Sequence, residues 1–495
     1  MIISLQRTKT YKAAISLGIV ICLLFFSVEI INAQKEQESD PERRLTVGTL
    51  FNTNASGFDD NLPFWLHANQ QGLFEQRSAN ALFFTEFDLP ILTGNDLSIR
   101  GSGKLTGQIS ENSDIGANTL SLRADYRSFI AQVGKFIDPV GMNYHPLSSG
   151  SMMVSTNAEP VPKIMIKTDG FLDVPLAQGY VQFSTYLSHG WFEDSRYVKN
   201  VYLHQKYLYL KINYKMLEGI GGVIHNVQWG GTSPDYGKLP SSFNDYIRMV
   251  FAQGAEAESG APGGEQSNSL GNSVAAYDFN LRISLDQYRL TFYRLFYLED
   301  KVSSRFRSPW DGMWGGGIIF KEEHPILKSL LYEHINTKRQ DSFDFEPRGS
   351  QNYYSNFVYR SGWTYKNRVL GNPLILTNGS NRSPITNNII VAHHLGANGF
   401  ISPHFKWKAY YTFSRNYGVV ADQIIRRLEP GDPIRAELRP LEELKKVNHS
   451  IFIGSNITLP ESPRFHFNLG VAADLGELYT DRFGIIAGIT YDIID

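Results

Sequence analysis

Residues 404–415, HFKWKAYYTFSR, alternate between apolar and polar side chains. The odd-numbered positions from 405 to 413 are apolar, among them Phe405, Trp407 and Phe413, whereas most even-numbered positions are polar. Successive side chains of a β-strand point to opposite faces, so this period of two predicts a strand with one apolar face and excludes a helix. The same alternation recurs in the ranges 279–286, 465–473 and 483–493.

The N-terminus has the composition of an export signal. Arg7, Lys9 and Lys12 precede an apolar run, and Ala33 is a small residue where a signal peptidase would cut. We therefore predict a signal peptide over residues 1–33. The alternative, an anchoring helix, is disfavoured because the apolar run is shorter than the roughly 20 residues that span a bilayer. The single cysteine, Cys22, lies inside this run, so disulfides and thiolate metal sites are excluded from the mature chain.

The charge and hydropathy of the remaining chain narrow its class. Removing Arg7, Lys9, Lys12 and Glu29 with the signal leaves 44 Lys and Arg against 48 Asp and Glu, so no electrostatic case for nucleic-acid binding exists. After the signal no apolar stretch is long enough to form a spanning helix. Only helices and closed barrels satisfy every backbone group in lipid, so a membrane-spanning part would have to be a closed barrel. We predict an all-β, transmembrane outer-membrane β-barrel of about 16 to 18 antiparallel strands with a small N-terminal periplasmic or plug segment.

The predicted organisation has three parts. They are the signal peptide (1–33), a tether with a small periplasmic or plug segment that does not alternate cleanly (34–90), and the barrel (91–495). Expected strands include 180–187, 201–214, 289–298, 353–365, 450–459 and 482–494. Long polar stretches, expected to face the outside, are 230–245, 253–274, 301–312, 336–351, 367–388 and 416–447. The last is predicted to hold a short surface helix through Ile434, Leu438, Leu441 and Leu444. A secreted β-propeller or sandwich is the soluble alternative, but the fixed repeat of about 40 to 50 residues that a propeller would show is missing.

Six segments combine aromatic rings with His, Arg or planar amides. They read PFWLHANQ (63–70), PLSSGS (146–151), SHGWFE (188–193), HNVQWGGTSP (225–234), YRSGWTY (359–365) and AHHLG (392–396). Ring faces can cover the apolar face of a sugar while amides and guanidinium groups bond its hydroxyls. The candidate glycan-binding residues are Trp65, His67, Asn69, Trp191, Gln228, Trp229, Arg360 and Trp363. Alternatively, the same residue types line a barrel lumen as a packed hydrogen-bonded network.

Motifs of catalysis and metal binding are missing from the sequence. Neither a G-x-S-x-G elbow, an H-E-x-x-H helix nor a calcium-hand spacing occurs. We therefore expect a protein that is not an enzyme and needs no cofactor or metal. A barrel-embedded hydrolase would have to use His225 or His404 with a nearby Asp.

The six segments, in this order, resemble the Wzi-type capsule assembly family. The resemblance implies an outer-membrane barrel of roughly eighteen strands. It also implies a surface lectin that binds exported capsular or extracellular polysaccharide and helps assemble or anchor it at the surface of a Gram-negative cell. Expected partners are this polysaccharide, outer-membrane lipid and the capsule export machinery. A porin or specific uptake channel is the main alternative, and a barrel-embedded hydrolase is a third.

Overall fold

The computed structural model describes residues 43–494 with the exception of 56–59, 78, 143–144, 194, 257–261, 264–265, 267–268, 300–307, 341–351 and 432–434. The predicted signal peptide, its cleavage site and the tether up to residue 42 lie outside the described residues. Within the described ranges, none of the helices has the length and apolar character needed to span a membrane.

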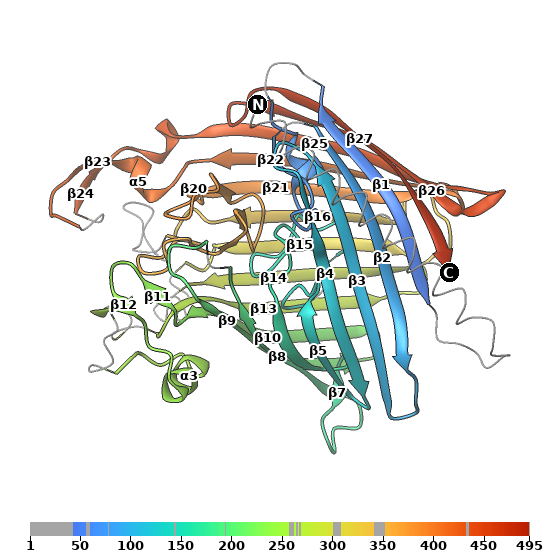
Figure 1. Cartoon of the computed structure of the whole chain (residues 1–495), viewed down its shortest axis with the longest axis horizontal. Helices are drawn as coiled ribbons and strands as arrows, with labels where there is room; N and C mark the ends of the chain where they lie inside the picture. Colours follow the sequence, from blue (N-terminus) through green and yellow to red (C-terminus); the bar gives the residue numbers. More distant parts are fainter. Residues whose placement is uncertain are drawn as a thin grey trace, which may run out of the picture. The chain divides into compact units, whose positions relative to one another are not determined.

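One antiparallel sheet forms the wall of a closed barrel (Figure 1). Its strands are β1 (Arg44–Asn54), β2 (Asn80–Leu92), β3 (Leu97–Ile109), β4 (Asp114–Tyr126), β5 (Phe129–Lys135), β6 (Lys163–Thr168), β7 (Leu172–Asp173), β8 (Val181–Trp191), β9 (Tyr202–Tyr214), β10 (Leu217–Trp229), β13 (Asn272–Ser284), β14 (Tyr288–Leu298), β15 (Gly312–Phe320), β16 (Ser329–Asn336), β21 (Ile390–Ser402), β22 (Phe405–Asn416), β25 (Lys446–Leu459), β26 (Ser462–Gly476) and β27 (Arg482–Ile494). β27 pairs with β1 and closes the ring. Because β6 and β7 both pair with β8, the described wall has eighteen strands, which confirms the predicted fold class.

The alternation in β22 has a simple explanation in the barrel. Its odd positions face outward, where Trp407 lies beside the exposed Ile453 and Leu469 of neighbouring strands. Its even positions face the lumen, where Thr412 is buried and its hydroxyl lies 2.8 Å from His394 Nδ1. The apolar face therefore belongs to the outer surface of the wall, as a lipid-embedded barrel requires.

The connections differ strongly in length between the two ends of the barrel. At one end the turns are short, such as 215–216, 403–404 and 460–461, and β1 starts and β27 finishes there. The long connections lie at the other end, among them 230–271 and 417–445. In outer-membrane barrels the long connections face outside, so this end is called the external end below.

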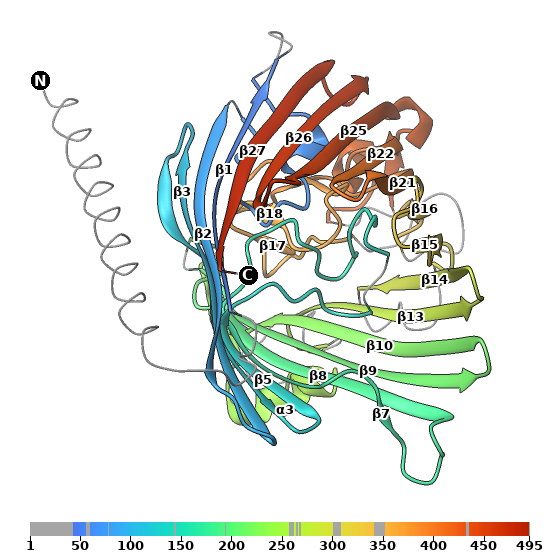
Figure 2. The ribbon, with the colours of Figure 1, turned by 90° about the vertical axis from the view of Figure 1, so that its right-hand side faces the viewer.

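Three connections of the external end fold back into the lumen and fill it. They are 55–79, which holds α2 (Phe64–His67), then 136–162, and 337–389, which holds β17 (Thr364–Tyr365), β18 (Arg368–Val369), β19 (Leu376–Thr377) and β20 (Ile385–Asn387). Figure 2 shows β17 and β18 inside the ring of wall strands. We call the three connections together the plug. Its apolar side chains pack with those of the wall strands in one buried core.

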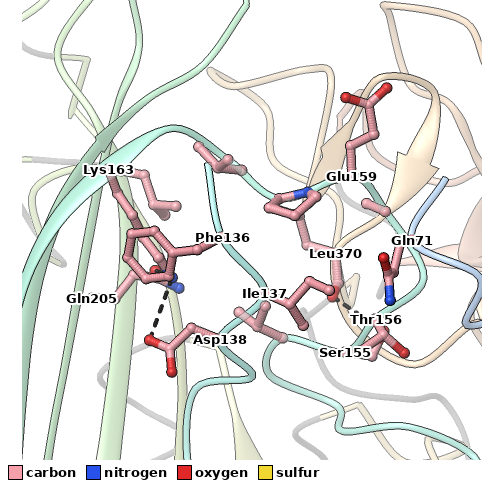
Figure 3. A pocket seen from close by; sticks show the side chains of 15 residues that line it. Gln71, Phe136, Ile137, Asp138, Ser155, Thr156, Glu159, Lys163, Gln205 and Leu370 are labelled. Carbon is pink, nitrogen blue, oxygen red and sulfur yellow. Dashed lines mark hydrogen bonds and ion pairs between the residues drawn. The ribbon is translucent and has the colours of Figure 1, made fainter. Parts of the chain in front are cut away.

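Polar contacts attach the plug to the wall. Glu333 of β16 accepts hydrogen bonds from the Ser149 amide (2.7 Å) and the Ser148 hydroxyl (2.6 Å). Asp138 of the plug lies 3.7 Å from the Lys163 ammonium of β6 (Figure 3). The ammonium of Lys167, on the same strand, lies 3.1 Å from Asp138. Buried carboxylates are stable when they are paired in this way, so these contacts fix the plug in place.

The structure corrects the predicted boundary between plug and barrel. β1 and β2 lie within the expected non-barrel segment 34–90, yet both are wall strands, and the part between them enters the lumen. The prediction failed because three successive residues at the start of β2, Leu82 to Phe84, are apolar, so the alternation is hidden there. Phe83 is exposed on the outside, whereas Leu82 and Phe84 face inward and pack against Leu73 and Phe74 of the plug.

Two other expectations are also wrong. Residues 353–365 are not a wall strand but a buried part of the plug, in which only β17 is extended and paired. The predicted surface helix over 434–444 is replaced by β24 (Ala436–Leu438), which pairs with β23 (Ile424–Arg427), and by the 3-10 turn Leu441–Glu443. Pro440 lies between these two elements and would interrupt a helix there. Residue 434 lies outside the described residues.

Because the plug fills the lumen, we expect the purified protein to show no steady large conductance in planar bilayers. Replacing residues 352–389 by a short linker should open steady conductance, since that connection supplies much of the buried core. The matched control shortens the β23–β24 hairpin, which projects from the external end. Steady conductance of the unaltered protein would contradict the filled lumen.

Candidate functional site

Two of the predicted glycan-binding residues, Trp363 of the plug and Gln228 of the wall strand β10, are buried where the plug meets the wall. Trp363 has no exposed surface, and its indole N–H donates to the Met153 carbonyl at 2.8 Å. Gln228 is likewise inaccessible and donates to the Gly362 carbonyl at 2.9 Å. A sugar cannot reach either side chain, so we assign both to packing and correct their predicted place on the surface.

Trp65 and Asn69 lie deeper in the lumen. The Trp65 ring packs between His394 and Tyr410, with centroid distances of 5.1 and 5.0 Å. Asn69 adopts a positive φ of 55° and donates to the Ser149 carbonyl at 2.7 Å. Both residues line a cavity of about 430 Å³ whose wall side includes Lys408. Lys408 lies near the start of β22, at the short-turn end, so this cavity is remote from the external surface.

Trp191 and Trp229 lie on the outer face of the wall. Trp229 is buried there under the helix α3 (Phe243–Val250), and its ring centroid is 5.6 Å from that of Tyr246. Trp191 is 42% exposed at the end of β8. Neither tryptophan is brought together with Trp363, so the predicted aromatic residues do not form one site.

Arg360 belongs to an open polar cluster at the external end, which we call the rim cluster: Tyr197, Asp235, Arg360 and Arg382. Asp235 accepts a hydrogen bond from the Tyr197 hydroxyl at 2.8 Å and pairs with Arg360 at 2.8 Å. The guanidinium carbons of Arg360 and Arg382 lie 5.2 and 5.4 Å from the Tyr197 ring centroid. Sequence reasoning missed three of the four residues because they come from three separate connections and share no motif.

His67 lines a second cavity of about 170 Å³ near the external end. Its neighbour Arg368, which sequence reasoning also missed, donates to the Phe74 carbonyl and lies 3.5 Å from His67 Nδ1. Burial lowers the pKa of Arg368 to about 10. Burial, together with the charges of Arg368 and Arg482, holds the pKa of His67 well below its usual value. The imidazole is therefore neutral at physiological pH.

The histidines named for a hydrolase have other neighbours. His225 lies on the outer face of β10, where its ring nitrogens are 2.7 Å from the Lys206 ammonium and 3.1 Å from the Ser273 hydroxyl. His404 belongs to the exposed two-residue turn between β21 and β22. In the described part of the chain, no three metal-ligating side chains of His, Cys, Asp or Glu gather into a cluster.

The fold defines an outer-membrane β-barrel with a filled lumen. The family described as "Capsule assembly protein Wzi" matches residues 97–375, which is more than half of the chain. The chain belongs to this capsule assembly family. Family and fold together place it in the outer membrane of a Gram-negative bacterium. Curated protein sequences give no match.

Several solved structures are similar to this chain, and the first of those below shares its barrel fold. The structure of Wzi from Escherichia coli, described as a carbohydrate-binding β-barrel involved in group 1 capsule assembly, is similar at 14% identity and a TM-score of 0.53, covering 90% of this chain and 83% of that one. OccK5 of Pseudomonas aeruginosa has 9% identity and a TM-score of 0.45, with coverage of 92% and 98%. OprD of the same organism has 8% identity and a TM-score of 0.43, with coverage of 94% and 98%.

We expect Trp363→Ala and Trp229→Ala to impair folding rather than ligand contact. Truncating a buried Trp costs about 3–5 kcal/mol of stability. The measurement is the fraction of protein that migrates faster on gels when unheated, as closed barrels do. Trp363→Phe should lose less, and Arg360→Gln should fold normally because its side chain is partly exposed. Normal folding of both alanine variants would contradict the packing roles.

Proposed function

We propose that this protein binds exported capsular or extracellular polysaccharide at its external end and retains it at the cell surface, without acting as an enzyme. The observation that carries the proposal is the filled lumen. The chain belongs to a capsule assembly family, and side chains pack its lumen. A polymer would therefore contact the external end of the barrel and would not enter a channel.

The rim cluster has the chemistry that recognition of a sugar requires. Two guanidinium groups supply donors in fixed directions, and the Asp235 carboxylate accepts hydrogen bonds from hydroxyls. The mutual contacts of Tyr197, Asp235 and Arg360 hold these groups in position before a ligand arrives, which reduces the entropic cost of binding. The carbohydrate binding described for the E. coli barrel agrees with this proposal.

Two further partners follow from the same proposal. Outer-membrane lipid would contact the exposed apolar side chains of the wall, such as Leu210, Ile212 and Phe279. The capsule export machinery stays a prediction from the sequence. A porin or uptake channel, the main alternative, would need an open lumen.

We expect Tyr197→Ala and Arg360→Gln to weaken binding of purified surface polysaccharide fragments by roughly tenfold or more, because hydrogen bonds to charged groups contribute about 1.5–3 kcal/mol. Short fragments are needed because multivalent binding of the whole polymer would hide the loss of one contact. Affinity is measured on detergent-solubilised protein whose unheated gel migration is normal.

The matched control is Arg426→Gln. Arg426 also lies at the external end and forms an exposed ion pair with Glu437 at 2.7 Å, but it belongs to the β23–β24 hairpin and not to the rim cluster. Its binding should equal that of the unaltered protein. Undiminished binding by both rim variants would remove the rim cluster from the glycan site.

A further inference from the structure

The cavity beside His67 is built by three external connections and carries positive charge. Asn61 and Gln76 come from the first connection of the plug, Arg368 from its third, and Arg482 from the start of β27. Gln76 and Thr386 are exposed, so the cavity opens to solvent. Two arginines and no carboxylate occur among its lining residues, and its 170 Å³ is more than ten times the roughly 15 Å³ that one water needs.

Arg368 is the unusual residue of this cavity. Its side chain is buried, with 8% of the residue exposed, and its contacts are the carbonyls of Phe74 and His67 and the His67 ring. Among the described residues no carboxylate lies within 4 Å of its guanidinium, and the charges of Glu75 and Glu159 act on it only at longer range. A buried cation without a contacting carboxylate is costly, so an anion that entered the cavity would give this guanidinium the direct partner that these two residues do not provide.

The neighbours of Arg368 are arranged to accept such an anion. An arginine can only donate, so His67 Nδ1 accepts and the proton of the neutral ring is on Nε2, which makes it a donor. The Arg482 guanidinium lies 4.5 Å from the Tyr479 ring centroid, which restricts its position. The side chains of Pro373 and Leu376 add apolar surface, and Thr377 adds a hydroxyl.

We propose that this cavity binds one negatively charged sugar residue, so that the polymer retained at the surface is an acidic polysaccharide. This inference rests on the proposed function and specifies its ligand class. A guanidinium binds a carboxylate or a sulfate ester with two parallel hydrogen bonds. The apolar and hydroxyl groups of the cavity suit the ring that bears the charge.

The test uses three oligosaccharide probes and purified protein in detergent. They are oligogalacturonate, the same oligomer after chemical reduction of its carboxyl groups, and a sulfated neutral oligosaccharide. We expect the unaltered protein to bind at least one charged probe ten times or more tightly than the reduced one, and to lose this preference at high salt. The two charged probes distinguish carboxylate from sulfate as the recognised group.

Arg482→Gln and Arg368→Gln should each abolish the preference, whereas Arg426→Gln should keep it. If Arg368→Gln fails to fold, Arg482→Gln decides the matter, because it lies on the solvent side of the cavity. Equal binding of charged and reduced probes would overturn the cavity proposal and leave the proposed function intact. Binding of none of the probes would overturn the cavity proposal, whereas the proposed function would be overturned only if purified surface polysaccharide fragments also failed to bind.

The helix α3 carries a second, independent inference. It lies on the outside of the wall, because it covers His204, whose neighbours on the same face of β9, Leu208 and Leu210, are 54% and 52% exposed. The ring centroids of Tyr246 and His204 are 5.5 Å apart. A capping box between Ser242 and Asp245 fixes the start of the helix.

The opposite face of α3 is apolar and uncovered. Phe243, Ile247 and Phe251, four residues apart, are 79%, 39% and 69% exposed. This stripe continues the exposed apolar surface of the wall beneath it, where Trp191 and Val223 are 42% and 47% exposed. We propose that α3 rests in the outer leaflet of the membrane with this stripe among the lipid chains, as interfacial amphipathic helices do.

The test places a new tryptophan at Phe243 and reconstitutes the protein in vesicles with brominated acyl chains. The fluorescence added by Phe243→Trp should be quenched at least twofold relative to vesicles of unbrominated lipid. The control is Ile425→Trp, an exposed position on the β23–β24 hairpin, whose added fluorescence should be unaffected. Equal quenching of both, or of neither, would overturn the proposal.

Discussion

The pairing of β27 with β1 is the contact on which the rest of this structure depends. In lipid an unsatisfied backbone N–H or C=O costs several kcal/mol, so a sheet with two open edges could not persist there. The antiparallel register from Leu45 and Ile494 to Asn54 and Gly484 removes both edges at once. The closure also brings both ends of the described chain to the short-turn side and assigns every long connection to the external end.

Closure creates a second requirement, because a barrel of this size encloses a wide lumen. The protein fills it with connections instead of water, and the polar inner face of the wall supplies partners for them. Glu333, Asp474 and His394 bond to the plug through the Ser149 amide, the Phe64 amide and the Leu147 carbonyl. The inner face is therefore polar for a structural reason, and its polarity alone does not indicate a transport path.

The sequence predicted the wall well wherever its two faces meet different surroundings. In β22 one face meets lipid and the other meets a hydrogen-bonded lumen, so the alternation is clear. At the start of β2 both faces are apolar because Leu82 and Phe84 pack against the plug. The alternation is therefore interrupted there, and it returns only where Glu86 and Asp88 face inward. Residues 353–365 caused the opposite error, because they were predicted to be a wall strand and belong to the plug. The error arose because a buried plug segment is as rich in aromatic residues as a wall strand.

The candidate site was predictable only in its composition. Aromatic and amide residues do gather in the plug, but Trp363 and Gln228 are oriented inward by partners more than a hundred residues away in sequence. Arg360 was among the predicted residues, whereas its neighbours Tyr197 and Asp235 were not, because nothing in a single sequence indicates that three connections meet at one place. His67 was predicted without Arg368, one of the two arginines that line its cavity.

The rim cluster has a mechanical consequence. Its residues come from connections that join different pairs of wall strands: β8 with β9 for Tyr197, β10 with β13 for Asp235, and β16 with β21 for Arg360. Each connection is anchored at both ends. Tension on a chain held there by fluid flow would thus divide over three points of the circumference. The tension would act along the strand direction on the hydrogen bonds between neighbouring wall strands. Many of these hydrogen bonds would then resist together instead of opening one after another.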